Sequence, residues 1–260
     1  MESSRKRAAL ITGASSGIGR EFARQLDRMQ VADELWLIAR KEEALVAVAE
    51  GLDTPSRPVA ADLTNPDDIA KIRALLAEEE PQVTFLVNAA GFGKFGDWQT
   101  ISDAVADAMI DLNCRGLVDM TRAALPYMER GSRIIQVASA AAFTPLPHMN
   151  VYAATKAFVL RYSRALRWEL HGTGITVTAL CPTWVKTGFE KVARSSGGGG
   201  DVGHLLGAQD AATVVRRALG ANKAHLAVAC ASPQSAALRL VGKVVPSCLT
   251  MAGWDLLRRL

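Results

Sequence analysis

The sequence predicts an α/β protein built on a doubly wound parallel sheet. Short apolar segments alternate along the chain with longer segments of helical pattern. The short segments are apolar nearly throughout, which is typical of parallel strands that helices cover on both faces. A glycine-rich turn joins the first short segment to the first helical one, and this arrangement favours nucleotide binding.

Seven segments are predicted as strands and six as helices between them. The strands are residues 8–12, 34–39, 57–61, 83–88, 133–138, 175–180 and 226–231. The helices are residues 17–29, 41–51, 66–80, 102–128, 151–171 and 208–219, and 102–128 can begin as two pieces. Asn65 and Pro66 are expected to start the third helix, and Gly220 is expected to cap the last one.

The 260 residues are predicted to form one domain. Hydrophobic residues make up 49% of the chain and charged residues 22%, which provides a large core and argues against disorder. The net charge of +4 lies partly at the chain ends, in residues 5–7 and 258–259, and forms no basic stripe with interleaved aromatic residues. We therefore expect no nucleic-acid partner.

The beginning of the chain has no signal-peptide pattern, and no apolar run is long enough to span a membrane. The four cysteines, Cys114, Cys181, Cys230 and Cys248, lack the spacing of metal ligands. We expect thiols rather than disulfides, and no metal. These observations favour a reducing, cytoplasmic location.

The glycine-rich turn reads Gly-Ala-Ser-Ser-Gly-Ile-Gly and follows the first strand. Its glycines let the chain turn tightly and let the backbone approach a pyrophosphate on the N–H groups of a helix N-terminus. A purely structural turn is the alternative, but the position between a strand and a helix favours a cofactor. The predicted contacts are Gly13, Ser15, Ser16, Gly17, Ile18 and Gly19.

The end of the second strand bears on the choice of cofactor. An acidic residue there would bind the ribose 2′-hydroxyl of NAD, whereas an arginine accommodates the 2′-phosphate of NADP. This chain has Ala39 followed by Arg40, so we predict NADP(H), preferred over NAD(H). A solvated charge at a helix start is the alternative for Arg40. Residues at the ends of the third and fourth strands complete the predicted contacts: Asp62, Leu63, Asn88, Ala89 and Gly91.

A serine, a tyrosine and a lysine form the most informative spacing. Tyr152 follows Ser139 by thirteen positions, and Lys156 follows Tyr152 by four. Residues four apart on a helix share a face, so Lys156 can lie beside Tyr152. A tyrosine is a poor acid or base at neutral pH because its pKa is about 10, but a nearby cation favours the phenolate. Taken alone, such a pair is more often a solvated contact on a helix surface.

Together these motifs resemble the short-chain dehydrogenase/reductase family. Thr12 with the glycine turn, Asp62, Asn-Ala-Ala-Gly at 88–91, Asn113, Ser139 and Tyr152-x-x-x-Lys156 occur in the family's order and spacing. The motifs cover residues 7–192, and the order of elements covers the whole chain. The resemblance implies a Rossmann-like, three-layer α/β/α fold with a seven-stranded parallel sheet.

The resemblance also implies a mechanism. Tyr152 would be the general acid in ketone reduction and the general base in alcohol oxidation. Lys156 would bind the nicotinamide ribose and lower the Tyr152 pKa. Ser139 would orient the substrate oxygen, and Asn113 would hold a water that links Lys156 to solvent. The residue types fit, because an alkoxide formed by hydride transfer needs a proton donor and a second hydrogen-bond donor.

The chain departs from the family pattern after the sixth strand, where Thr183 replaces the glycine of Pro-Gly-x-x-x-Thr. The backbone there must accept a Cβ atom. The resemblance still implies cofactor contacts from Pro182, Val185 and Thr187, with Thr187 at the nicotinamide carboxamide. Trp184 is a candidate to close one side of the nicotinamide pocket.

The predicted substrate pocket is mostly apolar. Its candidates are Phe92, Phe95, Ala141, Phe143, Leu146, Met149, Trp184 and parts of 189–206, some of which also pack the core. Candidates for binding a charged group are Lys94, His148 and Lys186. We predict a bulky apolar alcohol or ketone as substrate, with hydroxysteroid-like compounds as the leading example.

Two segments lie outside this framework. Residues 187–207 include four consecutive glycines, 197–200, which hold neither a helix nor a strand well, and are predicted to be a mobile substrate lid. A passive insertion is the alternative. Residues 236–260 are predicted as an amphipathic or loosely apolar helix containing Pro246. This C-terminal extension packs on its own domain, covers a partner subunit's pocket or rests on a membrane surface.

The sequence therefore predicts an NADP-dependent oxidoreductase that interconverts a secondary alcohol and a ketone. The resemblance implies a homodimer or homotetramer built on 102–128 and 151–171. A non-catalytic nucleotide sensor or scaffold with the same fold is the alternative from another class, although such a protein has no need of the Ser139, Tyr152 and Lys156 that this chain retains. A membrane-surface enzyme that uses 236–260 is the third hypothesis.

Overall fold

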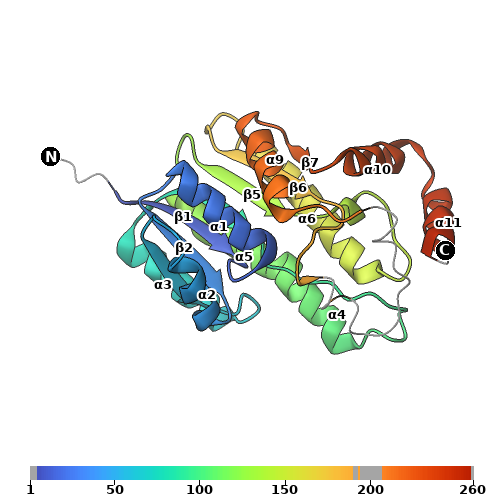
Figure 1. Ribbon diagram of the computed structural model, residues 1–260, viewed down its shortest axis with the longest axis horizontal. Coiled ribbons are helices and arrows are strands. Elements are labelled where there is room, and N and C mark those ends of the chain that lie inside the picture. Colours follow the sequence, from blue (N-terminus) through green and yellow to red (C-terminus); the bar gives the residue numbers. More distant parts are fainter. Residues whose placement is uncertain (1–4, 190–192, 194–206, 259–260) are drawn as a thin grey trace.

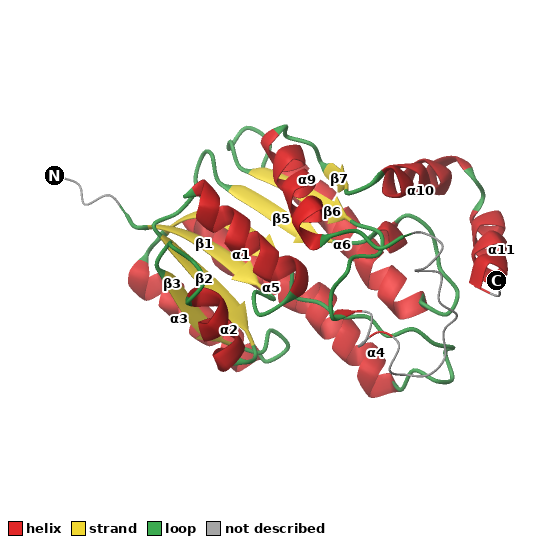
Figure 2. Ribbon diagram, viewed as in Figure 1, coloured by secondary structure: helices red, strands yellow, loops and turns green. Residues whose placement is uncertain are grey.

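A computed structural model, which describes residues 5–189, 193 and 207–258, shows three layers with a parallel sheet in the middle (Figure 1, Figure 2). The seven strands are arranged in the order β3-β2-β1-β4-β5-β6-β7. The chain builds one half of the sheet outward from β1 to β3 and the other from β4 to β7. The predicted doubly wound, Rossmann-like fold is confirmed.

The strands lie close to their predicted positions. They are β1 (Arg7–Thr12), β2 (Glu34–Ala39), β3 (Ser56–Ala60), β4 (Gln82–Asn88), β5 (Arg133–Val137), β6 (Thr176–Cys181) and β7 (Val228–Cys230). Pro58 lies in β3, where it is tolerated because β3 is an edge strand and needs fewer N–H donors. Strand β7 is shorter than predicted, and Leu226, expected as its first residue, is exposed at the turn before it.

Helices cover both faces of the sheet (Figure 2). Helices α1 (Gly17–Met29), α2 (Glu42–Ala49) and α9 (Ala211–Lys223) pack on one face. Helices α3 (Pro66–Glu79), α5 (Leu117–Ala124) and α6 (Asn150–Glu169) pack on the other. The strands other than the edge strand β3 are largely buried on both faces, which explains why their sequences are apolar nearly throughout.

The predicted helix 102–128 changes geometry along its length. It consists of α4 (Asp103–Ile110), a π-helical turn η1 (Asp111–Gly116), α5 and a 3₁₀ turn η2 (Leu125–Tyr127). Gly116 ends the π turn against the carbonyl of Leu63, where an added Cβ atom would lie 2.8 Å from Leu63 O. Turns of this kind occur often at functional sites, and this one contains Asn113.

The predicted end of the last sheet helix is wrong. Gly220 lies inside α9, which continues to Lys223. Asn222 holds this final turn on the sheet, because its Nδ2 donates to Ile134 O at 3.3 Å and to Thr178 Oγ1 at 3.1 Å. The tertiary contact outweighs the local preference of glycine for a helix end.

The C-terminal extension consists of two helices rather than the predicted one. They are α10 (Pro233–Val244) and α11 (Ser247–Arg258), and Pro246 lies between them because proline cannot continue a helix. Both lie beyond β7 at the end of the molecule opposite the N-terminus (Figure 1). Within the described parts of the chain, no helix has both the length and the apolar character needed to cross a bilayer. Of the predicted lid, 190–192 and 194–206 lie outside the described residues, so the lid stays a prediction.

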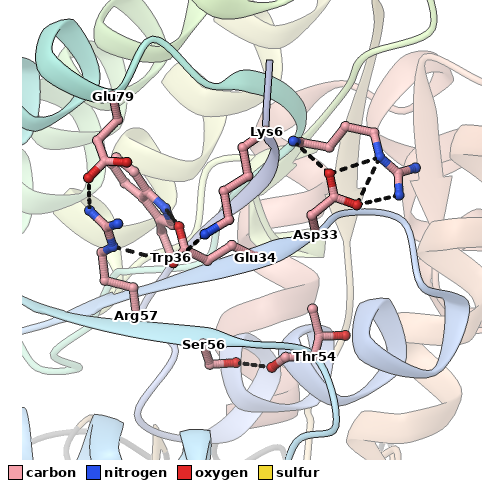
Figure 3. Close-up of polar contacts among 9 residues, drawn as sticks. Lys6, Asp33, Glu34, Trp36, Thr54, Ser56, Arg57 and Glu79 are labelled. Carbon is pink, nitrogen blue, oxygen red and sulfur yellow. Dashed lines mark hydrogen bonds and ion pairs between the residues drawn. The ribbon is translucent and has the colours of Figure 1, made fainter. Parts of the chain in front are cut away.

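The amino end of the sheet is held by charged side chains (Figure 3). Glu34, at the start of β2, accepts a hydrogen bond from Trp36 Nε1 at 2.7 Å and pairs with Lys6 at 3.2 Å. Arg57 lies with its guanidinium 4.9 Å from the Trp36 ring centroid and pairs with Glu79 at 2.9 Å. Ligands of open α/β sheets bind at the carboxyl ends of the strands, so this network stabilises the opposite end.

A buried polar network joins β4 and β5 to α5. Asn88 Nδ2 donates to Thr121 Oγ1 at 3.0 Å and to Gln136 Oε1 at 2.9 Å. Gln136 Nε2 donates to the same Thr121 oxygen at 3.0 Å. The Thr121 hydroxyl in turn donates to Leu117 O at 2.7 Å. One threonine oxygen therefore satisfies two buried amide groups.

Thr121→Val should remove this shared acceptor and leave buried amide donors unpaired. We expect the free energy of unfolding, measured with urea, to fall by about 1–3 kcal/mol. The matched control is Thr250→Val, because the Thr250 hydroxyl donates to Ser247 O at 3.0 Å on an exposed helix. It should change stability by less than about 0.5 kcal/mol. Equal effects of the two substitutions would contradict the assignment.

Candidate active site

The glycine-rich turn forms a cradle at the carboxyl end of β1. Gly13 (φ +67°) and Gly17 (φ +54°) both adopt the left-handed backbone conformation that favours glycine. A Cβ atom on Gly13 would lie 2.8 Å from Ala90 N, and one on Gly19 would overlap Gly13 O. Both positions thus exclude a side chain, because the protein's own backbone comes too close to them.

The N-terminus of α1 has the features of an anion-binding site. No described side chain caps this helix at Ser16, and its first turn has no acidic residue. Helix α3 differs, since Asn65 caps it by accepting from Asp67 N at 3.0 Å. The free N–H groups and the positive end of α1 are what pyrophosphate binding requires. The residues of the turn therefore fit a dinucleotide.

Thr12 connects this turn with the end of β4. Its Oγ1 accepts hydrogen bonds from Ala89 N and Ala90 N, each at 3.1 Å. Gly91 follows, and a Cβ atom on it would lie 2.8 Å from Asn113 Oδ1 and 3.3 Å from Lys156 Nζ. The predicted contacts Ala89 and Gly91 therefore lie between the turn and the catalytic candidates.

Other predicted cofactor residues differ in their surroundings. The Oδ1 atom of Asp62 accepts from Thr64 N at 2.9 Å, which holds the carboxylate at the end of β3. Leu63 is buried against Gly116. Asn88 is also a predicted cofactor contact, which stays a prediction, and its amide nitrogen donates to Thr121 and Gln136. Its side chain therefore holds the end of β4 in place.

Positive charge gathers beside the turn. Arg40 is exposed in the loop after β2. A hollow of about 240 Å³ lies between α1 and α2 and is lined by Ser15, Arg20, Arg24, Ala44, Ala47, Val48 and Gly51. Arg24 is partly balanced by Glu21, 4.0 Å away. Arginine donates several hydrogen bonds in a planar fork, so Arg20, Arg24 and Arg40 are residues that could contact an anionic group of a cofactor.

The structure brings Ser139, Tyr152 and Lys156 together at the carboxyl end of β5. The Tyr152 hydroxyl lies close enough to the Ser139 side chain for Ser139 to favour the phenolate and so oppose a rise in the Tyr152 pKa. Lys156 Nζ lies 5.9 Å from the Tyr152 ring centroid and donates to Val137 O at 2.9 Å. Both α6 side chains are buried, with 7% of Tyr152 and 5% of Lys156 exposed. The pair is not the solvated surface contact that was the alternative for this motif.

Burial controls the pKa values of this pair. It raises the pKa of Tyr152 to about 12, and the nearby Ser139 side chain opposes the shift. It lowers the pKa of Lys156 from 10.5 to about 8. Lys156 was expected to lower the Tyr152 pKa, but in the structure the loss of hydration of the phenolate dominates. Tyr152 is therefore protonated at neutral pH, which suits a proton donor.

Asn113, on the π-helical turn, makes hydrogen bonds to the loop after β4 and to α6, and its expected role in holding a water stays a prediction. Its Nδ2 donates to Phe92 O at 2.8 Å and to Thr155 Oγ1 at 3.0 Å, and its Oδ1 accepts from Phe92 N at 3.1 Å. The side chain thus fastens the loop after β4 to α6, next to Lys156. Sequence reasoning missed Thr155, although its place on α6 between Tyr152 and Lys156 was a usable signal.

Thr183, which replaces the glycine of the family pattern, has its side chain hydrogen-bonded by Gln209, a residue that follows the predicted lid. Gln209 Nε2 donates to Thr183 Oγ1 at 2.6 Å, and Gln209 N donates to Trp184 O at 2.8 Å. No local pattern could have identified Gln209. Thr187 lies beside the glycine turn, since a Cβ atom on Gly17 would be 3.2 Å from Thr187 Cγ2. The other predicted contacts of this segment, Pro182 and Val185, are buried.

Aromatic rings pack against Tyr152 on the substrate side. Phe189 lies 5.6 Å from Tyr152 between ring centroids, and Phe95 lies 5.9 Å away. Trp184 in turn packs edge-on against Phe95 at 5.7 Å. The predicted pocket residues in this aromatic cluster are Phe92, Phe95, Ala141, Leu146, Met149, Trp184 and Phe189. Phe143 differs from prediction, because it packs in another cluster with Val159 and Cys181.

The candidates for a charged substrate group are placed as follows. Lys186 is exposed, and its N–H donates to Gln209 O at 2.9 Å. His148 pairs with Asp97 and, at 3.5 Å, with Asp255. Lys94 N donates to Met109 Sδ at 3.3 Å. The described wall of the site is thus mainly apolar and aromatic.

Comparison with known proteins identifies the family. The model of the short chain dehydrogenase family matches residues 7–197, and the chain belongs to this family. Sulfoacetaldehyde reductase 2 of Chromohalobacter salexigens is 37% identical over 200 residues, which is 70% of this chain and 74% of that protein.

Two solved structures extend the likeness. A short-chain dehydrogenase from Sphingobium yanoikuyae in complex with NADPH has a TM-score of 0.79 and 29% identity over 94% of each chain. The bulky-bulky ketone specific alcohol dehydrogenase of Comamonas testosteroni has a TM-score of 0.70 and 27% identity, over 87% of this chain and 86% of that one. The protein is thus an NAD(P)-dependent oxidoreductase, and the comparisons give no support to a non-catalytic sensor.

The lowered pKa of Lys156 predicts how stability depends on pH. Between pH 8 and 10.5 the unfolded chain holds a proton on Lys156 that the folded protein has released. The free energy of unfolding therefore gains a contribution that rises with pH. In the Lys156→Met variant this contribution is absent, so the stability difference, wild type minus variant, should increase across this window. Urea denaturation at several pH values measures this stability difference. The control is Lys223→Met, which removes an exposed lysine in place of the buried one. A difference that stays flat with pH would show that Lys156 is not buried as described.

Proposed function

We propose that this enzyme interconverts a bulky apolar ketone and its secondary alcohol with NADP(H) as the preferred cofactor. The observation that carries the proposal is the group of Ser139, Tyr152 and Lys156 at the edge of an aromatic cluster. It combines a protonated phenol, a second hydroxyl and a buried cation beside an apolar wall. Hydroxysteroid-like compounds are the leading example of such substrates.

The residues divide the work of the reduction. The cofactor supplies the hydride, and the protein supplies geometry and proton transfer. Ser139 and Tyr152 donate hydrogen bonds to the substrate oxygen, which stabilises the negative charge that develops there. Tyr152 then gives its proton to the alkoxide. Lys156 would hold the nicotinamide ribose and favour the resulting phenolate, and Asn113, which fixes the loop beside Lys156, would hold a water that links Lys156 to solvent.

The substrate class rests on the wall of the site. Phe95, Trp184 and Phe189 present ring faces and edges near Tyr152. An apolar substrate gains from displacing water from such rings, with about 25 cal/mol for each Å² buried. The named relatives act on different compounds, a sulfoacetaldehyde in one case and bulky ketones in another. The aromatic wall favours the second class for this chain.

The cofactor preference rests on charge. Arg40 follows β2 where NAD-binding relatives of this fold carry an acidic residue. Arg20 and Arg24 line the hollow on the same side of the turn. A 2′-phosphate would find cations there and no carboxylate at Ala39. The NADPH complex of the structurally similar Sphingobium protein supports the same choice.

Assembly and location complete the proposal. Exposed apolar side chains on α4 and α6, Ile110, Phe158 and Trp168, support a homodimer or homotetramer built on these helices. Each of the four cysteines, all within the described residues, is a free thiol. Free thiols support a reducing compartment such as the cytoplasm.

Tyr152→Phe tests the proposed proton donor. The ring still packs, but the proton is missing, so kcat for reduction of a bulky ketone should fall by about 100-fold or more. The Kd of NADPH, measured by fluorescence, should stay within twofold. Tyr162→Phe is the control on the same helix and should keep kcat within threefold. A loss below tenfold in Tyr152→Phe would contradict the role.

Arg40→Asp tests the cofactor preference. The wild-type protein should bind NADPH more tightly than NADH. A carboxylate beside a 2′-phosphate is repulsive, so the variant should lose roughly 10–100-fold in NADPH affinity and prefer NADH. Calorimetry with both cofactors measures the ratio, and exposed Arg28→Asp at the far end of α1 is the control. Equal affinity of the wild type for the two cofactors would refute the preference.

A further inference from the structure

We propose that Trp254, on the C-terminal helix α11, is a specificity-determining residue that forms one wall of the substrate site. The inference deepens the proposed function and rests on it. It assigns a role to the extension beyond β7, which lies outside the residues that the family model matches. In this role the extension selects substrates by their size and apolar surface, and it acts on the active site of its own polypeptide chain.

The position of Trp254 carries the proposal. Its ring packs against the aromatic cluster that contains Tyr152, Phe95 and Met149. Its Nε1 donates to Pro147 O at 3.0 Å, across 107 positions of sequence. The hydrogen bond fixes the orientation of the ring, and a tryptophan brings about 150–250 Å² of surface to such a contact. Because its orientation is fixed, the Trp254 ring forms part of the rigid lining of the substrate site.

The neighbouring residue strengthens the attachment of α11. Asp255 lies 3.5 Å from His148 Nε2, and the other ring nitrogen of His148 pairs with Asp97. Gly96 N donates to His148 O at 2.9 Å, which joins the two loops that bear these residues. These loops also carry Phe95 and Met149 of the cluster. Helix α11 is therefore anchored to the same backbone that shapes the substrate side.

Helix α10 holds the extension close to the catalytic serine. Gly242 packs directly on the loop after β5, because an added Cβ atom would overlap Phe143 O. Ser235, buried at the start of α10, donates to Cys181 O at the end of β6. The outer faces of the two helices are exposed, with 69% of Val244 and 63% of Leu256 accessible to solvent. The contacts near the site thus come from Trp254 on α11 and Gly242 on α10.

A wall of this kind acts on large substrates more than on small ones. A bulky ketone reaches past the carbonyl that Tyr152 and Ser139 bind and contacts the side of the cluster where Trp254 packs. A small ketone occupies only the catalytic end. Removing the indole should therefore weaken binding of the bulky compound and leave the chemical step almost unchanged.

The experiment compares Trp254→Ala, Trp254→Phe and Leu256→Ala with the wild type. Leu256 is the control, because it lies two positions away on α11 and is exposed. Steady-state kinetics use NADPH with one small aliphatic ketone and one fused-ring ketone. Calorimetry on the NADP-loaded proteins measures binding of the fused-ring ketone without turnover. Circular dichroism and the Kd of NADPH report whether each variant is folded.

We expect Trp254→Ala to raise KM and Kd for the fused-ring ketone by about tenfold or more, with kcat and all values for the small ketone within threefold. Trp254→Phe should recover part of the affinity, and Leu256→Ala should match the wild type. If Trp254→Ala leaves the Kd of the fused-ring ketone within twofold, the wall assignment is wrong. If no protein turns over either ketone, the proposed function fails, whereas the calorimetric comparison still decides the role of Trp254.

Discussion

The structure depends on the burial of a lysine and a tyrosine on one face of α6. Lys156 donates a hydrogen bond to Val137 O at the end of β5, and Tyr152 lies beside Ser139, two residues further along the chain. Burial of both groups moves their pKa values in opposite directions, to about 8 and about 12. Burying ionisable groups costs free energy of folding. Groups with strongly shifted pKa values cluster at functional sites. The pair therefore links the core of the protein to its chemistry.

The sheet order explains why the cofactor and catalytic residues meet. The two halves of the sheet separate between β1 and β4, and ligands of open α/β folds bind at that point, beyond the carboxyl ends of the strands. The glycine turn follows β1, Gly91 follows β4 and Ser139 follows β5. The charged network around Glu34 stabilises the opposite edge. The stabilising charged network thus lies at the amino ends of the strands, and the candidate site lies at their carboxyl ends.

Sequence alone predicted what depends on local pattern. The strands, the glycine turn and the Tyr152–Lys156 spacing follow from periodicity and from residues four apart on a helix. It failed where contacts distant in sequence decide the outcome. Asn222 extends α9 past Gly220, because its side chain donates to Ile134 and Thr178 on the sheet. The partners Gln209 and Trp254 reach the site across long intervals of chain, so no spacing rule could reveal them.

We propose that NADPH bound at this site gives its hydride, and Tyr152 its proton, to a bulky apolar ketone. The most direct measurement uses NADPH that carries deuterium at the transferable position, with mass spectrometry of the product. The account predicts an alcohol with one deuterium on the carbinol carbon, formed by the wild-type enzyme. If NADPH binds but none of a panel of bulky apolar ketones yields deuterated alcohol, the account of this site is contradicted.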